Sequence, residues 1–389
     1  MAAAPLTIRL RKLWLDIHLW IGVGLLIAIL PLSATGAALV WRDGLDKVFN
    51  PQRYAVSGAA TRPLADYLAA GATAIGGEGA VTGVRLPAGV DEPVIVTARG
   101  RGAGEGGRPR NVSIWLDPTT LAVKDIGSAR GGAMQVMHEL HGTLLIPGIG
   151  RKVVGWVGWA MTLSCLTGLW LWWPRNGAFL PGLRWTRGSG VLFNLHHMVG
   201  FWICLPLLVL SLTGVYLSFP QTARALFGIE AQQPPQGGGA PKVAPRGPGG
   251  PGGGSGAPLA NPHLTPTAAA GAARALVPGG SLLSLNLPTA GRKPAWRAQV
   301  RTTPGGEPIF VEINDATGRA AIATKGQGIQ DPLSRWMRRL HDGGNLPLVW
   351  KWVITLGGVA PVILCLTGLV MWLQSRARKA RLRPVKVAA

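Results

Sequence analysis

The sequence predicts an α-helical membrane protein with four transmembrane helices, arranged as two parallel repeats, and two small α+β extracytoplasmic modules. Three observations lead to this prediction. Of the 389 residues, 48% are hydrophobic and only 14% are charged, whereas a soluble globular domain carries about 25% charged residues. Four long stretches contain no Asp, Glu, Lys or Arg. Two of these stretches repeat the other two.

The four uncharged stretches are long enough to cross a bilayer. They cover residues 17–41, 153–174, 188–223 and 352–375. A helix needs about 20 apolar residues to span a hydrocarbon core of about 30 Å. Trp residues gather near the ends of the stretches, as in an aromatic belt. The first stretch is too long for the apolar part of a cleaved signal peptide, so we expect an uncleaved anchor.

Basic residues predict the orientation of these spans. The N-terminal residues, the short loop 175–187 and the tail 376–389 together hold twelve Lys and Arg and one acid. By the positive-inside rule, both termini and the short loop are cytoplasmic. We therefore expect a multi-pass protein of the bacterial inner membrane with its two modules in the periplasm. The net charge of +22 then reflects the membrane topology. We therefore expect the lipid bilayer as a partner, and we do not expect nucleic acid.

The chain divides into nine segments on this interpretation. In order they are the cytoplasmic N-terminus with the first span (1–41), the first module (42–135), an interfacial segment with the second span (136–174), the cytoplasmic loop (175–187), the third span (188–223), a Pro/Gly-rich linker (224–260), the second module (261–330), an interfacial segment with the fourth span (331–375) and a basic cytoplasmic tail (376–389). Each module shows one short helical pattern followed by four β-rich runs. The linker composition cannot bury a core.

The second and fourth spans match each other, and so do the first and third. The matched positions are His141, Pro147 and Cys165-Leu166-Thr167-Gly168-Leu169 with His341, Pro347 and Cys365-Leu366-Thr367-Gly368-Leu369, and His18, Ser33, Thr35 and Gly36 with His196, Ser211, Thr213 and Gly214. Each unit of the duplication crosses the membrane twice, so the two copies have the same orientation. A pseudo-two-fold axis along the membrane normal is expected.

Histidines at the span ends are the candidate metal ligands. The expected axis brings His18 toward His196 on the inner side, and His141 toward His341 on the outer side. Two facing imidazoles are the axial ligands of a six-coordinate haem iron, so we expect one haem near each membrane face. Zinc is less favoured, because a structural zinc site has four ligands. Any single histidine of this kind can also merely cap a helix or reach the headgroups.

Two further histidines and four arginines leave choices open at these sites. His197 follows His196, and His138 lies one helical turn before His141, so either could replace or assist its neighbour. The outer arginines are Arg130, Arg335, Arg338 and Arg339. Guanidinium groups bind carboxylates in pairs, so haem propionates or an anionic metal chelate are candidate partners. The alternative is an amphipathic helix that rests on lipid headgroups.

The order of these motifs resembles the PepSY-associated transmembrane family, the iron-regulated inner-membrane proteins that include ferric-siderophore reductases. The resemblance rests on His18-Leu-Trp-Ile-Gly22, Leu140-His141-Gly142, Leu166-Thr167-Gly168, His196-His197-Met-Val-Gly200, Leu212-Thr213-Gly214 and Leu340-His341-Asp342-Gly343. It implies PepSY-like modules and haem b bound between the helices. It also implies the ligands His18 with His196 or His197, and His141 with His341, while His138 is an auxiliary ligand or none.

From the residues and the resemblance together, we expect a ferric-chelate reductase. This oxidoreductase would pass electrons from a separate cytoplasmic or quinone donor to a ferric siderophore or another ferric chelate in the periplasm. The donor is expected to be separate because no NAD or flavin fingerprint occurs in the sequence. The main alternative is a non-redox, membrane-anchored protein whose modules bind a regulatory partner. A transporter is less favoured, since no charged residue lies in mid-span.

Overall fold

The computed structural model describes most of the chain as two units. The described residues are 6–103, 109–128, 132–174, 180, 183–185, 188, 190–226, 257–291, 293–303, 305–323, 331–344 and 346–381. The membrane unit comprises Met1–Arg42, Val136–Gly239 and Pro332–Ala389, and the sheet unit comprises Asp43–Gln135 and Ala240–Asp331. Each unit is described by itself below.

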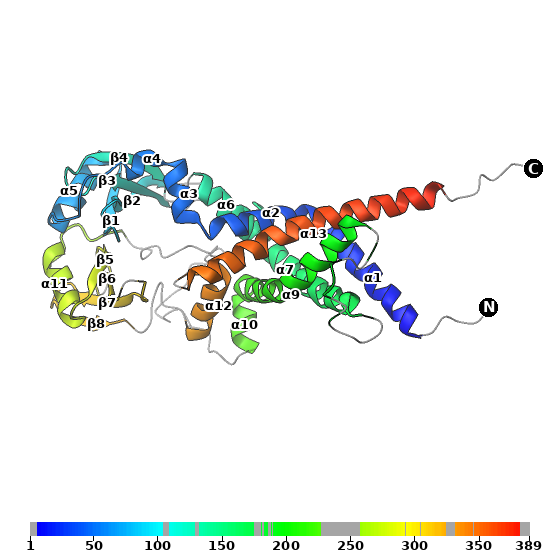
Figure 1. Cartoon of the computed structure of the whole chain (residues 1–389). Coiled ribbons are helices and arrows are strands. Elements are labelled where there is room, and N and C mark those ends of the chain that lie inside the picture. Colours follow the sequence, from blue (N-terminus) through cyan, green and yellow to red (C-terminus); the bar gives the residue numbers. More distant parts are fainter. Residues whose placement is uncertain are drawn as a thin grey trace, which may run out of the picture. The chain divides into compact units, whose positions relative to one another are not determined.

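The membrane unit is helical (Figure 1). Its helices are α1 (Leu6–Gly24), α2 (Leu26–Leu39), α6 (Ala133–Thr143), α7 (Gly150–Trp172), α9 (Val191–Ser218), α10 (Pro220–Leu226), α12 (Pro332–Asp342) and α13 (Leu348–Arg381). Among the described residues, three helices are long and apolar enough to cross a membrane by themselves, namely α7, α9 and α13.

The first predicted span, residues 17–41, lies in a bent pair of helices. α1 and α2 form a pair bent by 69° at Leu25. Helix-weakening residues flank the bend, because Gly22 and Gly24 precede it and Pro31 follows it without an N–H to donate. Counting apolar residues detects the length of such a segment but not its bend. The bent pair counts as a fourth candidate span only if it crosses as a broken helix.

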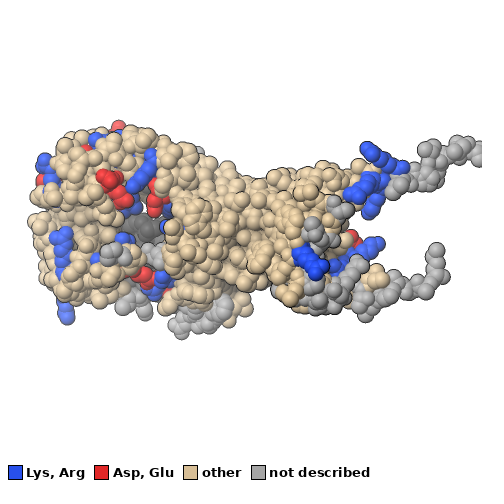
Figure 2. All heavy atoms as spheres, viewed as in Figure 1, with Lys and Arg blue, Asp and Glu red and all other residues tan. Residues whose placement is uncertain are grey.

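The surface of the membrane unit suits lipid. Large apolar side chains point outward from the helices, among them Ile27, Trp156, Trp202 and Leu205. Figure 2 shows a band of this unit whose visible face carries no Lys, Arg, Asp or Glu, next to cations at the end of α13. The interior holds the small polar side chains Thr, Ser and Asn together with Ile, Leu and Val. Helices in lipid pack through such small residues, because apolar surface alone does not draw them together.

The sheet unit holds one antiparallel sheet of eight strands in the order β4-β3-β2-β1-β5-β6-β7-β8. The strands are β1 (Gly79–Arg85), β2 (Val94–Ala103), β3 (Pro109–Leu116), β4 (Val123–Ser128), β5 (Ser281–Asn286), β6 (Ala295–Arg301), β7 (Ile309–Asn314) and β8 (Ala320–Ile322). The helices are α3 (Arg42–Phe49), α4 (Pro51–Tyr54), α5 (Leu64–Ala74) and α11 (Pro266–Leu276). Each half contributes four strands and one packed helix, α5 or α11.

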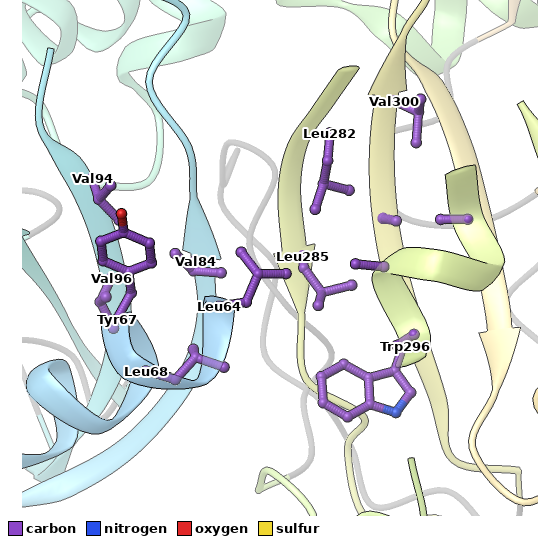
Figure 3. Close-up of a cluster of buried hydrophobic side chains, with 14 of the residues drawn as sticks. Leu64, Tyr67, Leu68, Val84, Val94, Val96, Leu282, Leu285, Trp296 and Val300 are labelled. Atoms are coloured by element: carbon purple, nitrogen blue, oxygen red, sulfur yellow. The ribbon is translucent and has the colours of Figure 1, made fainter. Parts of the chain in front are cut away.

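The two halves of the sheet are joined through β1 and β5, although separate modules were expected from the sequence. Val84 pairs with Leu285 at the centre of the junction. The backbone N–H of Leu86 donates to the Leu283 carbonyl at 2.8 Å, and that of Leu287 donates to Thr82 at 2.9 Å. Figure 3 shows side chains of both halves in one continuous apolar cluster at this junction. The second module thus covers an edge strand of the first, and an open edge invites unwanted pairing.

Each half also buries one aspartate directly after a strand. Asp117 follows β3 and is 2% exposed, and Asp315 follows β7 and is 1% exposed. Asp117 accepts hydrogen bonds from the backbone N–H of Ser57 at 3.0 Å and from two N–H groups in the following turn. Asp315 accepts from the backbone N–H of His263 at 2.9 Å and from the Trp296 indole at 2.8 Å. Both carboxylates therefore fasten the segment that leads toward the helix of their half.

Candidate functional site

The structure brings four of the candidate histidines together as two pairs within the membrane unit. His18 on α1 faces His196 on α9, with ring centroids 6.4 Å apart and ring planes at 89°. His141 on α6 faces His341 on α12, with ring centroids 5.9 Å apart and ring planes at 43°. In both pairs, one ring comes from each copy of the repeat. These are the pairings that the duplicated sequence predicts.

A neighbouring helix holds each ring of the His18–His196 pair by its Nδ1 atom. The distance from His18 Nδ1 to Thr167 Oγ1 on α7 is 3.0 Å. The equivalent distance from His196 Nδ1 to Thr367 Oγ1 on α13 is 2.9 Å. Both threonines are buried, at 3% and 6% exposure. His18 and His196 are thus held by two different helices through equivalent contacts.

The rings of the His141–His341 pair are held in nearly the same way. His341 Nδ1 lies 3.0 Å from Thr213 Oγ1 on α9. His141 Nδ1 lies 2.9 Å from the backbone carbonyl oxygen of Leu32 on α2, three residues before Thr35. The buried hydroxyl of Thr35 donates to the Pro31 carbonyl at 2.6 Å. The nearest oxygen to Nδ1 is therefore a backbone carbonyl for His141 and a threonine hydroxyl for the other three rings.

The residue after each of these threonines is a glycine on which the ring edge rests. A Cβ atom built on these glycines would approach the Cε1 atom of the histidine ring closely, at 2.8 Å for Gly36 with His141, 3.1 Å for Gly168 with His18, 3.1 Å for Gly214 with His341 and 3.4 Å for Gly368 with His196. We call the Thr and Gly at positions 35–36, 167–168, 213–214 and 367–368 the Thr-Gly steps. They leave a recess that any side chain would fill.

Sequence reasoning did not connect the Thr-Gly steps with the histidine rings. From the sequence, Thr167 and Thr367 are attributed to helix packing. The glycines either leave room for a flat macrocycle or permit close packing, which is the common reason for small residues in membrane helices. A signal was nevertheless present. The pattern Cys or Ser, any residue, Thr, Gly occurs in all four predicted spans, at 33–36, 165–168, 211–214 and 365–368. A fourfold recurrence among four spans, equal in number to the paired histidines, points to a shared task.

His197 and His138 lie outside the two ring pairs. His197 stacks on Phe193, with ring centroids 5.4 Å apart, and on Trp172 at 6.3 Å. Of the tandem histidines, it is therefore His196 that faces His18. His138 is exposed, and it lies on α6 one turn before His141.

Three of the four candidate arginines lie on α12, the helix that carries His341. Arg335 and Arg338 are exposed, and Arg339 is half-buried. Ser334 on the buried face of this helix hydrogen-bonds Tyr216 of α9 at 2.8 Å. Arg130 lies outside the described residues.

The donor set of the pairs fits haem better than zinc. No group of three or more His, Cys, Asp or Glu suited to a metal ion occurs among the residues that the structure describes. Zinc in a structural site takes four such ligands. A haem iron needs only two axial ligands from the protein, and imidazoles serve in this role. Imidazole nitrogen bonds a metal at about 2 Å, so ring centroids 5.9 and 6.4 Å apart leave room for one metal ion between each pair.

These features define a multi-pass membrane protein that pairs histidines from separate helices and carries a sheet-forming unit. A family model described as the PepSY-associated TM region matches residues 15–375, so the chain belongs to the PepSY-associated transmembrane family. The family resemblance seen in the sequence motifs is thereby confirmed. A comparison with curated proteins gave no match.

Proposed function

We propose that this protein is a two-haem electron-transfer protein of the bacterial inner membrane that reduces ferric siderophores or other ferric chelates in the periplasm. The observation that supports this most directly is the presence of two histidine pairs within one membrane unit. His18 and His196 would hold one haem b, and His141 and His341 would hold the other. A haem whose axial positions are both filled by imidazoles supplies one-electron transfer and leaves no open position for substrate.

The charges at one end of the membrane unit support the proposed topology. Arg376, Arg378, Lys379 and Arg381 are exposed at the end of α13. Arg11 on α1 donates to the Leu171 carbonyl near the end of α7 at 2.8 Å, so the start of α1 lies beside the end of α7. By the positive-inside rule this end is cytoplasmic. The bent pair α1–α2 then acts as the fourth span, both termini are cytoplasmic, and the PepSY-like halves of the sheet unit are periplasmic.

A haem held by two imidazoles would supply an electron without binding the substrate at its iron. A ferric chelate therefore docks beside the outer pair. The exposed guanidinium groups of Arg335 and Arg338, on the helix that carries His341, suit the anionic groups of such a chelate. Fe(II) is a softer ion than Fe(III), so hard oxygen donors hold it less tightly after reduction. The electron donor is a separate cytoplasmic or quinone partner.

Absorption spectroscopy of the full chain in detergent tests this proposal. We expect a Soret band and sharp bands in the reduced state, and a loss of these reduced bands when a ferric siderophore is added anaerobically. His141→Ala and His18→Ala should each remove one haem, whereas His263→Ala in the sheet unit is the matched control. His197→Ala should keep both haems if His196 is the ligand. A colourless wild-type protein would instead support the anchored, non-redox binding protein.

A further inference from the structure

We propose that the four Thr-Gly steps are positioning elements that hold each paired histidine with its proton on Nδ1 and its Nε2 lone pair directed away from the supporting helix. This inference rests on the proposed function, because a haem iron binds the unprotonated nitrogen of a neutral imidazole. The threonine oxygen selects the nitrogen that carries the proton. For His141, the backbone carbonyl oxygen of Leu32, three residues before Thr35, has this role. The glycine lets the ring reach that oxygen.

The selection follows from the single proton of a threonine hydroxyl. Each threonine donates this proton to the carbonyl four residues earlier in its own helix, at 2.9 Å for Thr167, 2.8 Å for Thr367 and 2.8 Å for Thr213. A hydroxyl has one proton and two lone pairs, so its oxygen can then only accept a second hydrogen bond. With the hydroxyl proton on that carbonyl, the histidine Nδ1 beside the threonine oxygen is the donor. A neutral imidazole carries one N–H, and Nε2 is left as a lone pair.

His141 reaches the same protonation state with a different acceptor. The carbonyl oxygen of Leu32 has no proton, so Nδ1 of His141 has to donate across the distance of 2.9 Å. Thr35 meanwhile donates to Pro31, as the other three threonines donate within their own helices. Four rings from four different helices thus converge on one tautomer. Packing alone gives no reason for this agreement.

The chain offers an internal comparison for the packing explanation. Threonine in a membrane helix often bonds the carbonyl four residues earlier simply to satisfy its hydroxyl. Thr162 on α7 does so, donating to Gly158 at 3.0 Å, and it is as buried as the threonines of the steps. Among the described residues, no histidine hydrogen-bonds Thr162. A valine at position 162 therefore removes the same local bond without touching a proposed ligand.

The hydrogen bond to Nδ1 should also tune the iron. Donation from Nδ1–H makes Nε2 a stronger donor, and loss of such partners typically weakens metal binding about 10- to 100-fold. A stronger axial donor favours the ferric state, because hydrogen bonding around the ligands is one control on haem potential. Removal of the threonine oxygen should therefore raise the midpoint potential of the haem at that pair.

The test compares Thr213→Val, Thr213→Ser and the control Thr162→Val in the full chain in detergent. For Thr213→Val we expect about 10- to 100-fold weaker retention of the haem at the His141–His341 pair and a higher midpoint potential. Thr213→Ser should restore both values, and Thr162→Val should match the wild type. If Thr213→Val and Thr162→Val behave alike in retention and potential, the inference is wrong even though the proposed function stands.

A second readout keeps the inference testable without haem. The ¹⁵N chemical shifts of the histidine ring nitrogens report which nitrogen carries the proton, and they can be measured on the full chain produced without haem. We expect a protonated Nδ1 for His341 in the wild type and in Thr213→Ser, and a shift toward the other tautomer in Thr213→Val. A protonated Nε2 in the wild type would overturn the inference. A colourless wild-type protein with a protonated Nδ1 would overturn only the proposed function.

Discussion

The sheet unit and the membrane unit are each built from a repeated half, but the halves meet in different ways. In the sheet unit, β1 and β5 join through backbone hydrogen bonds, with Val84 opposite Leu285 in a shared apolar core. In the membrane unit, the repeats pack through α7 against α9 and α2 against α13, and facing imidazole rings from the two copies lie at two levels. The first junction satisfies its own polar groups. At each level of the membrane unit, two imidazole rings face each other. The same duplication therefore yields a continuous sheet in one unit and a candidate ligand site in the other.

The largest expected loss of stability comes from truncating a buried side chain in the shared core of the sheet. Leu285 is fully buried at the β1–β5 junction. Leu285→Ala should lower the unfolding free energy of the sheet unit by about 2–5 kcal/mol, because a cavity replaces buried methyl groups. Hydrogen exchange of the strands in the full chain measures this loss, and Leu276→Ala at the partly exposed end of α11 is the control. A simultaneous loss of haem would contradict the separation of scaffold and site.

The second largest effect, on haem retention, is expected from a Cβ atom placed in the recess beneath the His141 ring. A Cβ at Gly36 would lie 2.8 Å from the His141 ring, whereas at Gly368 it would lie 3.4 Å from His196. Gly36→Ala should therefore weaken haem retention at its pair by about 10- to 100-fold, and Gly368→Ala should weaken it less at the other pair. Gly190→Ala is the control, since a Cβ there meets nothing within 4 Å. Equal haem retention in all three variants would show that ring position does not depend on the glycines.

A third effect is the loss of stability of the sheet unit at low pH. Burial alone would raise the pKa of Asp117, but hydrogen bonds from Thr120, Thr119 and Ser57 outweigh it and hold this pKa well below its ordinary value. The pKa of Asp315 is lowered in the same way, against burial, by hydrogen bonds from His263, Leu264 and Trp296. A carboxylate with a lowered folded pKa stabilises the fold fully above its unfolded value of about 3.9. That contribution is then lost as pH falls further, through the folded value.

The sheet unit should accordingly lose stability below about pH 4, by up to about 1.4 kcal/mol per pH unit for each carboxylate. Asp117→Asn and Asp315→Asn should each make this slope shallower, because one fewer group takes up a proton on unfolding. Hydrogen exchange of the sheet strands between about pH 3 and pH 6 gives the slopes, corrected for the intrinsic exchange rate at each pH. An unchanged slope in both variants would mean that these carboxylates are not the titrating groups.

The smallest effect is expected at the surface of the sheet. Arg297 and Glu312 form an ion pair at 3.6 Å on neighbouring strands, and their side chains are 47% and 44% exposed. Exposed pairs contribute little because water and salt screen them. Glu312→Gln should change the stability of the sheet unit by less than about 1 kcal/mol. A larger change in the same hydrogen-exchange measurement would mean that the pair supports the junction of the halves.

Much of this arrangement follows from the sequence, and the exceptions have physical causes. The matched His18 and His196, and His141 and His341, predict the ring pairs because a duplicated bundle brings equivalent helices together. The bend at Leu25 was missed, since hydropathy measures the composition of a segment and not its direction. The β1–β5 junction was missed because strand edges separated by a long linker carry no mark of their partner. The Thr-Gly steps were missed because small residues in membrane helices usually serve packing.

Haem stoichiometry in single and double variants tests the central claim most directly. We predict two haems per chain in the wild type and one in His341→Ala. The double variant His141→Ala/His341→Ala should also keep one, because both rings serve the same site, whereas His18→Ala/His341→Ala should keep none. The proposed pairing of ligands across the repeat is wrong if the wild type binds no haem. It is also wrong if His141→Ala/His341→Ala empties both sites while His18→Ala empties neither.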